Sequence, residues 1–265
     1  MYIARKAEEI TQKNLKSKKI LLILGARQVG KTTLVKHVLQ GKKVVYLNLD
    51  IIVDKDRFLA LSSLSPQEAE RNINADYLII DETQRLSETG RITKGWYDFG
   101  VSFKIILLGS SSLNLLDQAA ESLTGRNEKI FLPPFLFKEI IASADWYLPT
   151  LDWKAVNKNF SAAVKAMLLS NLAYGSYPEV VASADKENIL LNLANDYLWK
   201  DILQMGEVKN PDVIKRLLVL LSHQIGSEVS INELSASLGL ARATIEKYLD
   251  LLEQSFVIFR LPAYS

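Results

Sequence analysis

The chain has 265 residues, of which 48% are apolar, and its formal net charge is only +2. It has no cysteine and two histidines, His37 and His223, which excludes a disulfide framework or thiolate metal site and argues against a zinc centre. Its longest apolar runs are far shorter than the roughly 20 residues of a membrane span, and its first ten residues lack the apolar core of a secretory signal. We therefore expect a cytoplasmic protein with no membrane contact, large enough for more than one domain.

The amino end of the chain is strongly basic. The first 43 residues hold eleven Lys and Arg against two acidic residues, Glu8 and Glu9, which gives a local net charge of +9. Such a segment, which we expect to include a basic helix, suits a polyanion such as a nucleotide or a nucleic acid. A solvated helix face that other surfaces balance explains the charge equally well, so both interpretations stay open.

Five short apolar runs in the first half of the chain predict strands. They are rich in Ile, Val, Leu, Phe and Tyr and are bounded by turn residues: Ile20–Leu24, Val44–Leu49, Tyr77–Ile80, Phe103–Leu108 and Ile130–Leu132. Polar stretches with helical spacing lie between them, including Thr32–Leu39 and Leu113–Leu123. Strands that alternate with helices predict a parallel sheet covered on both faces.

The pattern changes after residue 135. Residues 137–208 are predicted to be helical, with their strong break at 174–178, and another helix is expected over 211–224. Two short helices and a strand over 256–261 then end the chain. We therefore predict a core with a basic N-terminal helix over residues 1–135, a helical lid over 136–208 and a C-terminal domain over 209–265.

A glycine-bounded loop follows the first predicted strand and opens a helix. Gly25-Ala26-Arg27-Gln28-Val29-Gly30-Lys31-Thr32 has the spacing G-x-x-x-x-G-K-[ST], and Thr33 comes next. The glycines allow the loop to curl so that its backbone N–H groups point at phosphate oxygens, and the helix adds its positive N-terminal end. Lys31 can reach the β- and γ-phosphates, and the Thr32 hydroxyl can bind Mg²⁺. We expect this loop to bind ATP.

An acidic pair, Asp81-Glu82, ends another predicted strand. Ligands of a parallel sheet sit beyond the carboxyl ends of its strands, so Asp81 is expected near Thr32, where it can hold the Mg²⁺ shell. Glu82 could orient and deprotonate a water that attacks the γ-phosphate. A plain strand end before an acidic helix turn is the alternative. A phosphate-loop kinase is the weaker one, since a hydrolytic glutamate would not directly follow its aspartate.

Two further positions suit phosphoryl transfer. Ser110 and Ser111 follow the strand that ends at Leu108, where a hydroxyl could touch the γ-phosphate or the attacking water; a helix cap is the alternative. Arg126 precedes the last predicted strand and could stabilise the developing charge as an arginine finger, or be a surface arginine after Gly125.

Six segments taken in order resemble the AAA+-type ATPases of bacteria and archaea over nearly the whole chain. They are GARQVGKTT, LIIDETQRL, LLGSSSLNLL, ESLTGR, LPPFLFKEI and YGSYPEVV. The resemblance implies an α/β P-loop NTPase fold, with a three-layer parallel sheet of order 5-1-4-3-2 followed by a helical lid and a winged-helix domain. It also implies the roles given above for Lys31, Thr32, Asp81, Glu82 and either Ser110 or Ser111.

The same resemblance makes Arg126 the arginine finger, which in trans would require a homo-oligomer. It sets Pro178 against the adenine, although helix termination explains this proline equally well. Such proteins commonly continue into a domain that resembles restriction-type nucleases, whereas the printed sequence ends at Ser265. We therefore assign no nuclease chemistry, and a truncation of a longer protein is one interpretation.

Residues 230–261 have the spacing of a helix-turn-helix with Gly239 at the turn. In DNA-binding versions the second helix enters the major groove by its N-terminal residues, here Arg242, Thr244 and Lys247. Residues 211–265 carry five basic and six acidic residues, however, so they supply little of the phosphate neutralisation on which duplex affinity depends. A protein-contact module is as good an interpretation as a DNA reader.

The sequence thus predicts Mg²⁺-dependent ATP binding and hydrolysis coupled to movement of the lid and the winged helix, with DNA as one candidate partner. The alternatives are a low-turnover switch gated by nucleotide and a protein-interaction module that does not bind DNA.

Overall fold

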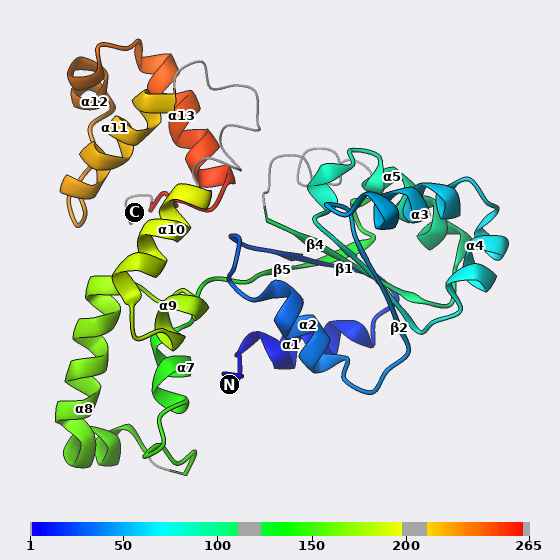
Figure 1. The fold of residues 1–265 in the computed structure, drawn as a ribbon, viewed down its shortest axis with the longest axis horizontal. Coiled ribbons are helices and arrows are strands. Elements are labelled where there is room, and N and C mark those ends of the chain that lie inside the picture. Colours follow the sequence, from blue (N-terminus) through cyan, green and yellow to red (C-terminus); the bar gives the residue numbers. More distant parts are fainter. Residues whose placement is uncertain (1, 111–122, 151, 198–210, 262–265) are drawn as a thin grey trace. The chain divides into compact units, whose positions relative to one another are not determined.

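The computed structural model describes residues 2–110, 123–150, 152–197 and 211–261. The chain forms two compact units, Met1–Leu191 and Asn192–Ser265, and each is described here by itself (Figure 1). The predicted boundaries near residues 135 and 208 stay a prediction.

A five-stranded parallel sheet is the central layer of the first unit. Its strands are β1 (Ile20–Leu24), β2 (Val44–Asn48), β3 (Tyr77–Asp81), β4 (Lys104–Gly109) and β5 (Asn127–Phe131). Their order is β2-β3-β4-β1-β5, and every neighbouring pair is parallel, which confirms the predicted order. Because β4 lies between β1 and β3, the carboxyl ends of these three strands are neighbours.

Helices cover both faces of the sheet, as the apolar runs predict. Figure 1 shows α1 (Ala7–Leu15) and α2 (Lys31–Val38) on one face and α3 (Ile52–Ser62), α4 (Pro66–Ile73) and α5 (Thr89–Phe99) on the other. Every residue of β1 and β4 is therefore buried. An aromatic cluster of Phe58, Trp96 and Phe103, with edge-to-face contacts, packs among the helices of the second face. The helix predicted over Leu113–Leu123 lies outside the described residues except at its last position.

The strand β5 begins earlier than the apolar pattern predicts. Asn127, Glu128 and Lys129 are polar, yet they belong to the ladder with β1. Among the described strands β5 pairs with β1 alone, so this edge strand tolerates exposed and half-exposed side chains. The pairing is set by the backbone, and composition at an edge does not reveal it.

The helical part of the first unit is more interrupted than expected. It contains α7 (Phe137–Ala142), α8 (Trp153–Tyr174), α9 (Pro178–Ala182) and α10 (Lys186–Tyr197), the last of which continues past residue 191. The prediction of helix throughout 137–208 is wrong where α7 ends and the chain turns before α8. The side chain of Asp152 accepts a hydrogen bond from the Ala155 N–H at 2.6 Å, so it caps a new helix rather than continuing the old one.

Three helices make up the described part of the second unit beyond α10. They are α11 (Pro211–His223), α12 (Ile231–Leu238) and α13 (Arg242–Gln254). Gly239 ends α12 with φ +65°, as a helix-turn-helix requires. The strand predicted over Phe256–Leu261 does not form within the residues described there. The chain instead turns at Phe256, with φ +60°, and the Arg260 N–H donates to Glu253 of α13 at 3.1 Å.

One buried lysine ties the end of α1 to the sheet. Lys104, at the start of β4, is 8% exposed, and its Nζ donates to the carbonyl oxygens of Asn14 at 2.7 Å and Ser17 at 2.6 Å, and also to that of Lys19. Carbonyls at the end of a helix lack partners within it, and a cation there is favourable. Burial lowers the pKa of Lys104 to about 8, and the charge of Glu128 opposes this shift.

Replacing Lys104 by Met is expected to lower the free energy of unfolding by about 2–3 kcal/mol, because buried carbonyls lose a charged donor. Urea denaturation measures the effect. Lys129→Met is the matched control, since Lys129 is an exposed strand lysine, and it should change stability by less than about 0.5 kcal/mol. Equal stability of the two variants would contradict the capping role.

Candidate functional site

The glycine-bounded loop joins β1 to α2 at the carboxyl edge of the sheet. Its backbone is close-packed at Gly25, where a built Cβ would lie 2.2 Å from the Leu132 carbonyl oxygen. Gly30, just before α2, has φ +93°, and Gln28 adopts φ +60° although it is not a glycine. A left-handed conformation at a residue with a side chain is costly and recurs at functional sites. The loop therefore has the tight curl that the motif predicts.

The side chain of Lys31 fills this loop. It is only 6% exposed, and its Nζ donates to the carbonyl oxygens of Gly25 and Ala26, both at 2.8 Å. A buried ammonium needs such acceptors, because an unpaired charge in the interior is expensive. The charge is thus held within the loop that the sequence assigns to phosphate.

Two side chains donate to one carboxylate oxygen of Asp81. Thr32 Oγ1 donates to Asp81 Oδ2 at 2.6 Å, and the Tyr46 hydroxyl donates to the same oxygen at 2.6 Å. Thr32 comes from α2, Asp81 ends β3 and Tyr46 lies on β2, so the parallel register brings them together. The predicted proximity of Thr32 and Asp81 is present in the structure. Burial and the bond to Asp81 raise the pKa of Tyr46, which keeps its hydroxyl a donor.

Glu82 follows Asp81 in a left-handed conformation, with φ +53° and ψ +42°. Its Oε2 accepts a hydrogen bond from Gln84 Nε2, which also donates to Ser110 Oγ at 2.8 Å. Ser110 Oγ itself donates to Glu82 Oε2 at 3.4 Å. The structure thus brings together Glu82 and Ser110, and Gln84 bridges them.

The charge state of Glu82 is set by opposing effects. Burial raises the pKa of its carboxyl group, and the positive charges of Arg27 and Lys31 lower it. The neighbouring carboxylates of Asp81 and Asp50 raise it again. A carboxyl group with a raised pKa is a better proton acceptor than an ordinary surface glutamate.

Arg126 lies at the amino ends of the strands, whereas the loop lies at their carboxyl ends. Its carbonyl accepts from the N–H of Ile20, the first residue of β1, whereas the loop follows the last residue of that strand. Four residue steps along a strand span roughly 13 Å. The guanidinium forms an ion pair with Asp98 of α5, Nε to Oδ1 at 2.6 Å. A role for Arg126 at the loop of its own chain does not fit this placement.

The environments of the remaining predicted site residues say little about their roles. Thr33 is exposed on α2, and Pro178 is the first residue of α9, where a proline is favourable. Ser111 lies outside the described residues. Near the start of α13, Arg242 pairs with Glu246 at 3.2 Å, Thr244 is half-buried and Lys247 is exposed.

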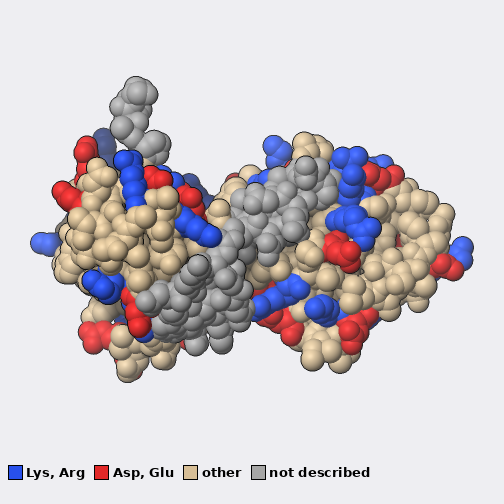
Figure 2. All heavy atoms as spheres, turned by 90° about the horizontal axis from the view of Figure 1, so that it is seen from above, with Lys and Arg blue, Asp and Glu red and all other residues tan. Residues whose placement is uncertain are grey.

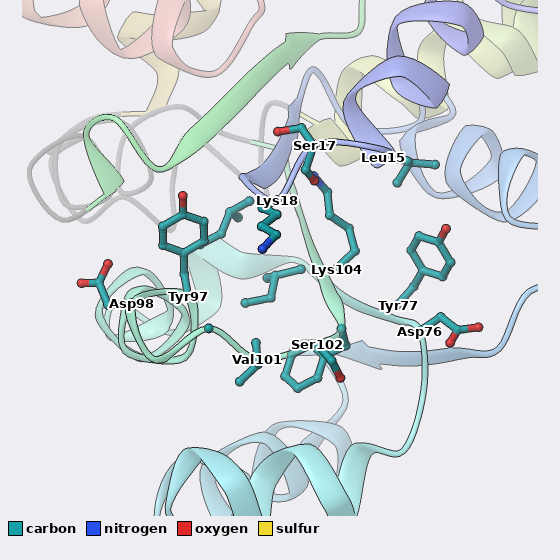
Figure 3. Close-up of a pocket in the computed structure, with 14 residues that line it drawn as sticks. Leu15, Ser17, Lys18, Asp76, Tyr77, Tyr97, Asp98, Val101, Ser102 and Lys104 are labelled. Atoms are coloured by element: carbon teal, nitrogen blue, oxygen red, sulfur yellow. The ribbon is translucent and has the colours of Figure 1, made fainter.

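A surface hollow of about 570 Å³ lies away from the loop, at the amino ends of β1, β3 and β4 (Figure 3). Tyr97 and Asp98 reach it from α5, and Ser17 and Lys18 from the segment before β1. Ligands of parallel sheets bind beyond the carboxyl ends of the strands. We therefore take the loop, and not this hollow, as the candidate site.

Sequence reasoning missed Tyr46 and Gln84. Tyr46 stands inside an apolar run, and it reaches Asp81 because β2 pairs with β3 in a register that only the structure gives. Gln84 follows Glu82 by two residues, and the 3₁₀ turn η1 (Thr83–Arg85) directs it back to Glu82. The sequence shows that Gln84 follows Glu82 by two residues, but only the structure shows that its side chain points back to Glu82.

Comparison with known families gives two matches along the chain. Residues 17–141 match the AAA domain family, and residues 167–265 match a domain of unknown function, DUF8612. The first match includes the whole sheet and both acidic residues of the site. The second begins within α8 and includes the helix-turn-helix.

Two curated relatives match most of this chain. An uncharacterized protein of Methanocaldococcus jannaschii is 28% identical over 99% of this chain and 62% of the relative. One of Haemophilus influenzae is 27% identical over 93% of this chain and 63% of the relative. The chain thus spans about three fifths of the length of these relatives.

A solved structure with a similar fold is the Walker-type ATPase PAby2304 of Pyrococcus abyssi. It superposes with a TM-score of 0.64, covers 96% of this chain and 90% of its own, and is 14% identical. At that identity the likeness concerns the fold.

In the described parts of the chain, every helix is too short or too polar to serve as a membrane span.

Gly25→Ala tests the close packing of the loop. The added methyl meets the Leu132 carbonyl at 2.2 Å, so we expect the free energy of unfolding to fall by about 1–3 kcal/mol. The control is Gly95→Ala in α5, where a Cβ would meet nothing within 4 Å and the better helix former should add up to about 1 kcal/mol. Urea titration compares them; a Gly25→Ala variant as stable as wild type would rule out the clash.

Proposed function

We propose that this chain is a prokaryotic AAA+-type ATPase that binds ATP at residues 25–33 and hydrolyses it. The AAA domain match over residues 17–141 and the sheet order support this proposal. The observation that carries the proposal is the meeting of Thr32 with Asp81, 2.6 Å apart, beside a loop that already holds a buried lysine. Glu82 follows directly and supplies a carboxylate at the same edge of the sheet. Together they form a phosphate site with a neighbouring base.

Binding would exchange the partners of Lys31. Its ammonium now bonds two loop carbonyls, and β- and γ-phosphate oxygens are stronger acceptors because they carry charge. The loop N–H groups and the start of α2 would add further donors to the phosphates. Residues 25 to 33 are the proposed nucleotide-binding residues, and Lys31 and Thr32 would contribute side chains as well.

The residues present fit a magnesium ion. Mg²⁺ is usually bound by one or two protein oxygens together with phosphate oxygens and waters, and Thr32 and Asp81 provide a hydroxyl and a carboxylate. The described residues contain no cluster of three or more His, Cys, Asp or Glu side chains suited to a metal, so the nucleotide would have to supply further ligands. When bound, the ion would neutralise phosphate charge, and Tyr46 would orient Asp81 toward it.

Glu82 would accept the proton of the attacking water. The water oxygen bonds to the γ-phosphorus as the bond from that phosphorus to the bridging oxygen breaks, which leaves ADP and phosphate. Ser110 would sense the γ-phosphate, and we keep Ser111 as its alternative. Pro178 as a contact of the adenine belongs to the same proposal, with helix initiation as its competing role.

A low-turnover switch is the second candidate, and one contact favours it. Gln84 and Ser110 both donate to Glu82 Oε2, so one of the two carboxylate oxygens is already engaged and the side chain is held in place. In a switch, these bonds would persist with nucleotide bound and would keep Glu82 from orienting a water. Release of Gln84 would then be the step that turns a switch into an enzyme.

Arg126 would act on a second copy of the chain. Its place at the amino edge of the sheet and its half-exposed pairing with Asp98 leave it accessible to a neighbour. In a homo-oligomer the guanidinium would approach the γ-phosphate held by the next subunit, where an arginine stabilises the developing charge. Assembly would therefore control the rate.

DNA contact through Arg242, Thr244 and Lys247 is the weakest part of the proposal. Arg242 is already paired with Glu246 on its own helix. Figure 2 shows basic and acidic side chains intermingled over the described parts of the molecular face that it draws, whereas a surface suited to phosphates carries a basic stripe. A protein partner for this helix-turn-helix is the competing proposal, as is movement of the winged helix and lid with nucleotide state.

Glu82→Gln tests hydrolysis itself. We expect phosphate release to fall by at least about 100-fold, because the variant cannot take a proton from water, while ATP affinity stays within about threefold. Steady-state release and equilibrium binding measure the two quantities. Lys31→Ala serves as the contrasting variant, since it should lose affinity as well. Equal turnover in wild type and Glu82→Gln would rule out Glu82 as the base, and slow turnover in both would favour the switch.

Mixing two inactive variants tests the arginine finger. Arg126→Ala and Lys31→Ala should each hydrolyse ATP poorly when pure. An equal mixture should regain part of the activity, because a subunit that binds ATP can receive an intact Arg126 from its neighbour. Light scattering checks that the variants assemble alike, and Arg91→Ala, an exposed arginine of α5, controls for loss of charge. No recovery in mixtures of assembled variants would count against action in trans.

A further inference from the structure

The segment before α1 is built into the nucleotide end of the unit. We call residues 2–6 the N-terminal strap. Tyr2 stacks on His37 at the end of α2, with ring centroids 3.9 Å apart, and its hydroxyl donates to Glu8 at 2.8 Å. The side chain of Arg5 is 4% exposed. These contacts anchor the strap to α1 and α2.

Arg5 joins three segments that are distant in the sequence. Its Nη1 donates to the Val29 carbonyl in the phosphate loop at 2.9 Å. Its Nη2 donates to the carbonyls of Pro133 at 2.6 Å and Pro134 at 3.3 Å, in the linker after β5. Its Nε donates to Glu139 of α7 at 3.1 Å. One planar guanidinium therefore holds the loop, the linker and the first helix after the sheet.

Glu139 completes the arrangement from the other side. It is 5% exposed, and its Oε1 accepts the Lys6 N–H at 2.6 Å while its Oε2 accepts the Leu136 N–H at 2.8 Å. The buried charge of Arg5 and that of Glu139 thus satisfy each other and the backbone around them. Removal of either partner would leave a buried charge without compensation.

The linker after β5 also contacts the segment between α8 and α9. The Arg5 guanidinium lies 4.7 Å from the centre of the Phe135 ring, and the Phe135 N–H donates to the Ser176 carbonyl between α8 and α9 at 2.8 Å. The helix α7, which carries Glu139, packs against α8. A continuous set of contacts therefore runs from Val29 in the phosphate loop to α7, to α8 and to Ser176 just before α9.

We propose that Arg5 is a positioning residue that couples occupation of the phosphate loop to the placement of helices α7–α9. The inference rests on the proposed function, because the signal it transmits is bound nucleotide. It adds a defined connection, through the N-terminal strap, between a site on the sheet and the helical lid.

The coupling depends on the fixed planar geometry of the Arg5 guanidinium. Gly30, the residue after Val29, is close enough to Arg5 that a built Cβ would lie 3.7 Å from Nη1. When Lys31 leaves the loop carbonyls for phosphate, the loop backbone adjusts. The guanidinium cannot follow Val29 without moving its bonds to Pro133 and Glu139, since its donors are fixed in one plane. A lysine keeps the charge but not this geometry.

Hydrogen exchange in the full chain tests the coupling. With a non-hydrolysable ATP analogue and Mg²⁺, we expect wild type to show slower exchange over residues 136–182. Arg5→Lys should bind the analogue within about threefold of wild type and lose most of that protection. Glu139→Gln, which removes the charge but keeps the shape, should behave in the same way. Arg91→Lys, an exposed arginine of α5, should keep the wild-type response.

The outcomes separate the coupling from the proposed function. If wild type binds the analogue and Arg5→Lys shows the same protection over 136–182, the coupling is wrong while nucleotide binding stands. If wild type does not bind the analogue, the proposed function is wrong and this inference with it. If both variants unfold, hydrogen exchange in wild type still tests the coupling. The exchange rate of the Lys6 amide must then change on analogue binding together with the rates over residues 136–182. Protection there with an unchanged strap would overturn the proposal.

Discussion

The parallel alignment of β1, β4 and β3 is the constraint on which the site depends. With β4 between the other two, the loop after β1 and the acidic pair after β3 reach the same edge, and Thr32 bonds Asp81 at 2.6 Å. The same alignment sets Ser110, which follows β4, beside Glu82. Burial of all three strands by helices on both faces makes the edge rigid. The buried strands of the core therefore position the side chains of the candidate site.

A second layer of contacts holds that edge in its present state. Lys31 is bound by loop carbonyls, Asp81 by Thr32 and Tyr46, and Glu82 by Gln84 and Ser110. Every charged group that phosphate chemistry would use is thus satisfied within the chain. Under the proposed function, nucleotide would replace bonds of this set, so binding and rearrangement would be linked. The contacts of Arg5 extend the same linkage to the helices after the sheet.

Much of the sheet and of the loop could be predicted from sequence because the signals are local. Continuous apolar runs mark buried strands, and the spacing from Gly25 to Thr32 reports a backbone shape. Tyr46, Gln84 and Arg5 could not be found in this way, since their partners lie in other segments and depend on strand register and chain reversal. The predictions of where β5 starts and of a strand over residues 256–261 were wrong for a related reason. Strand pairing depends on two segments, and the composition of one segment does not reveal its partner.

The central claim is that Thr32 and Asp81 form a magnesium-dependent ATP site, and calorimetric titration of ATP with and without Mg²⁺ tests it most directly. The account predicts that Mg²⁺ raises the ATP affinity of wild type by at least about tenfold, or roughly 1.4 kcal/mol, and that Asp81→Asn loses most of this gain while its fold, followed by circular dichroism, is retained. ATP binding that is absent, or that depends on Mg²⁺ equally in both proteins, would contradict it.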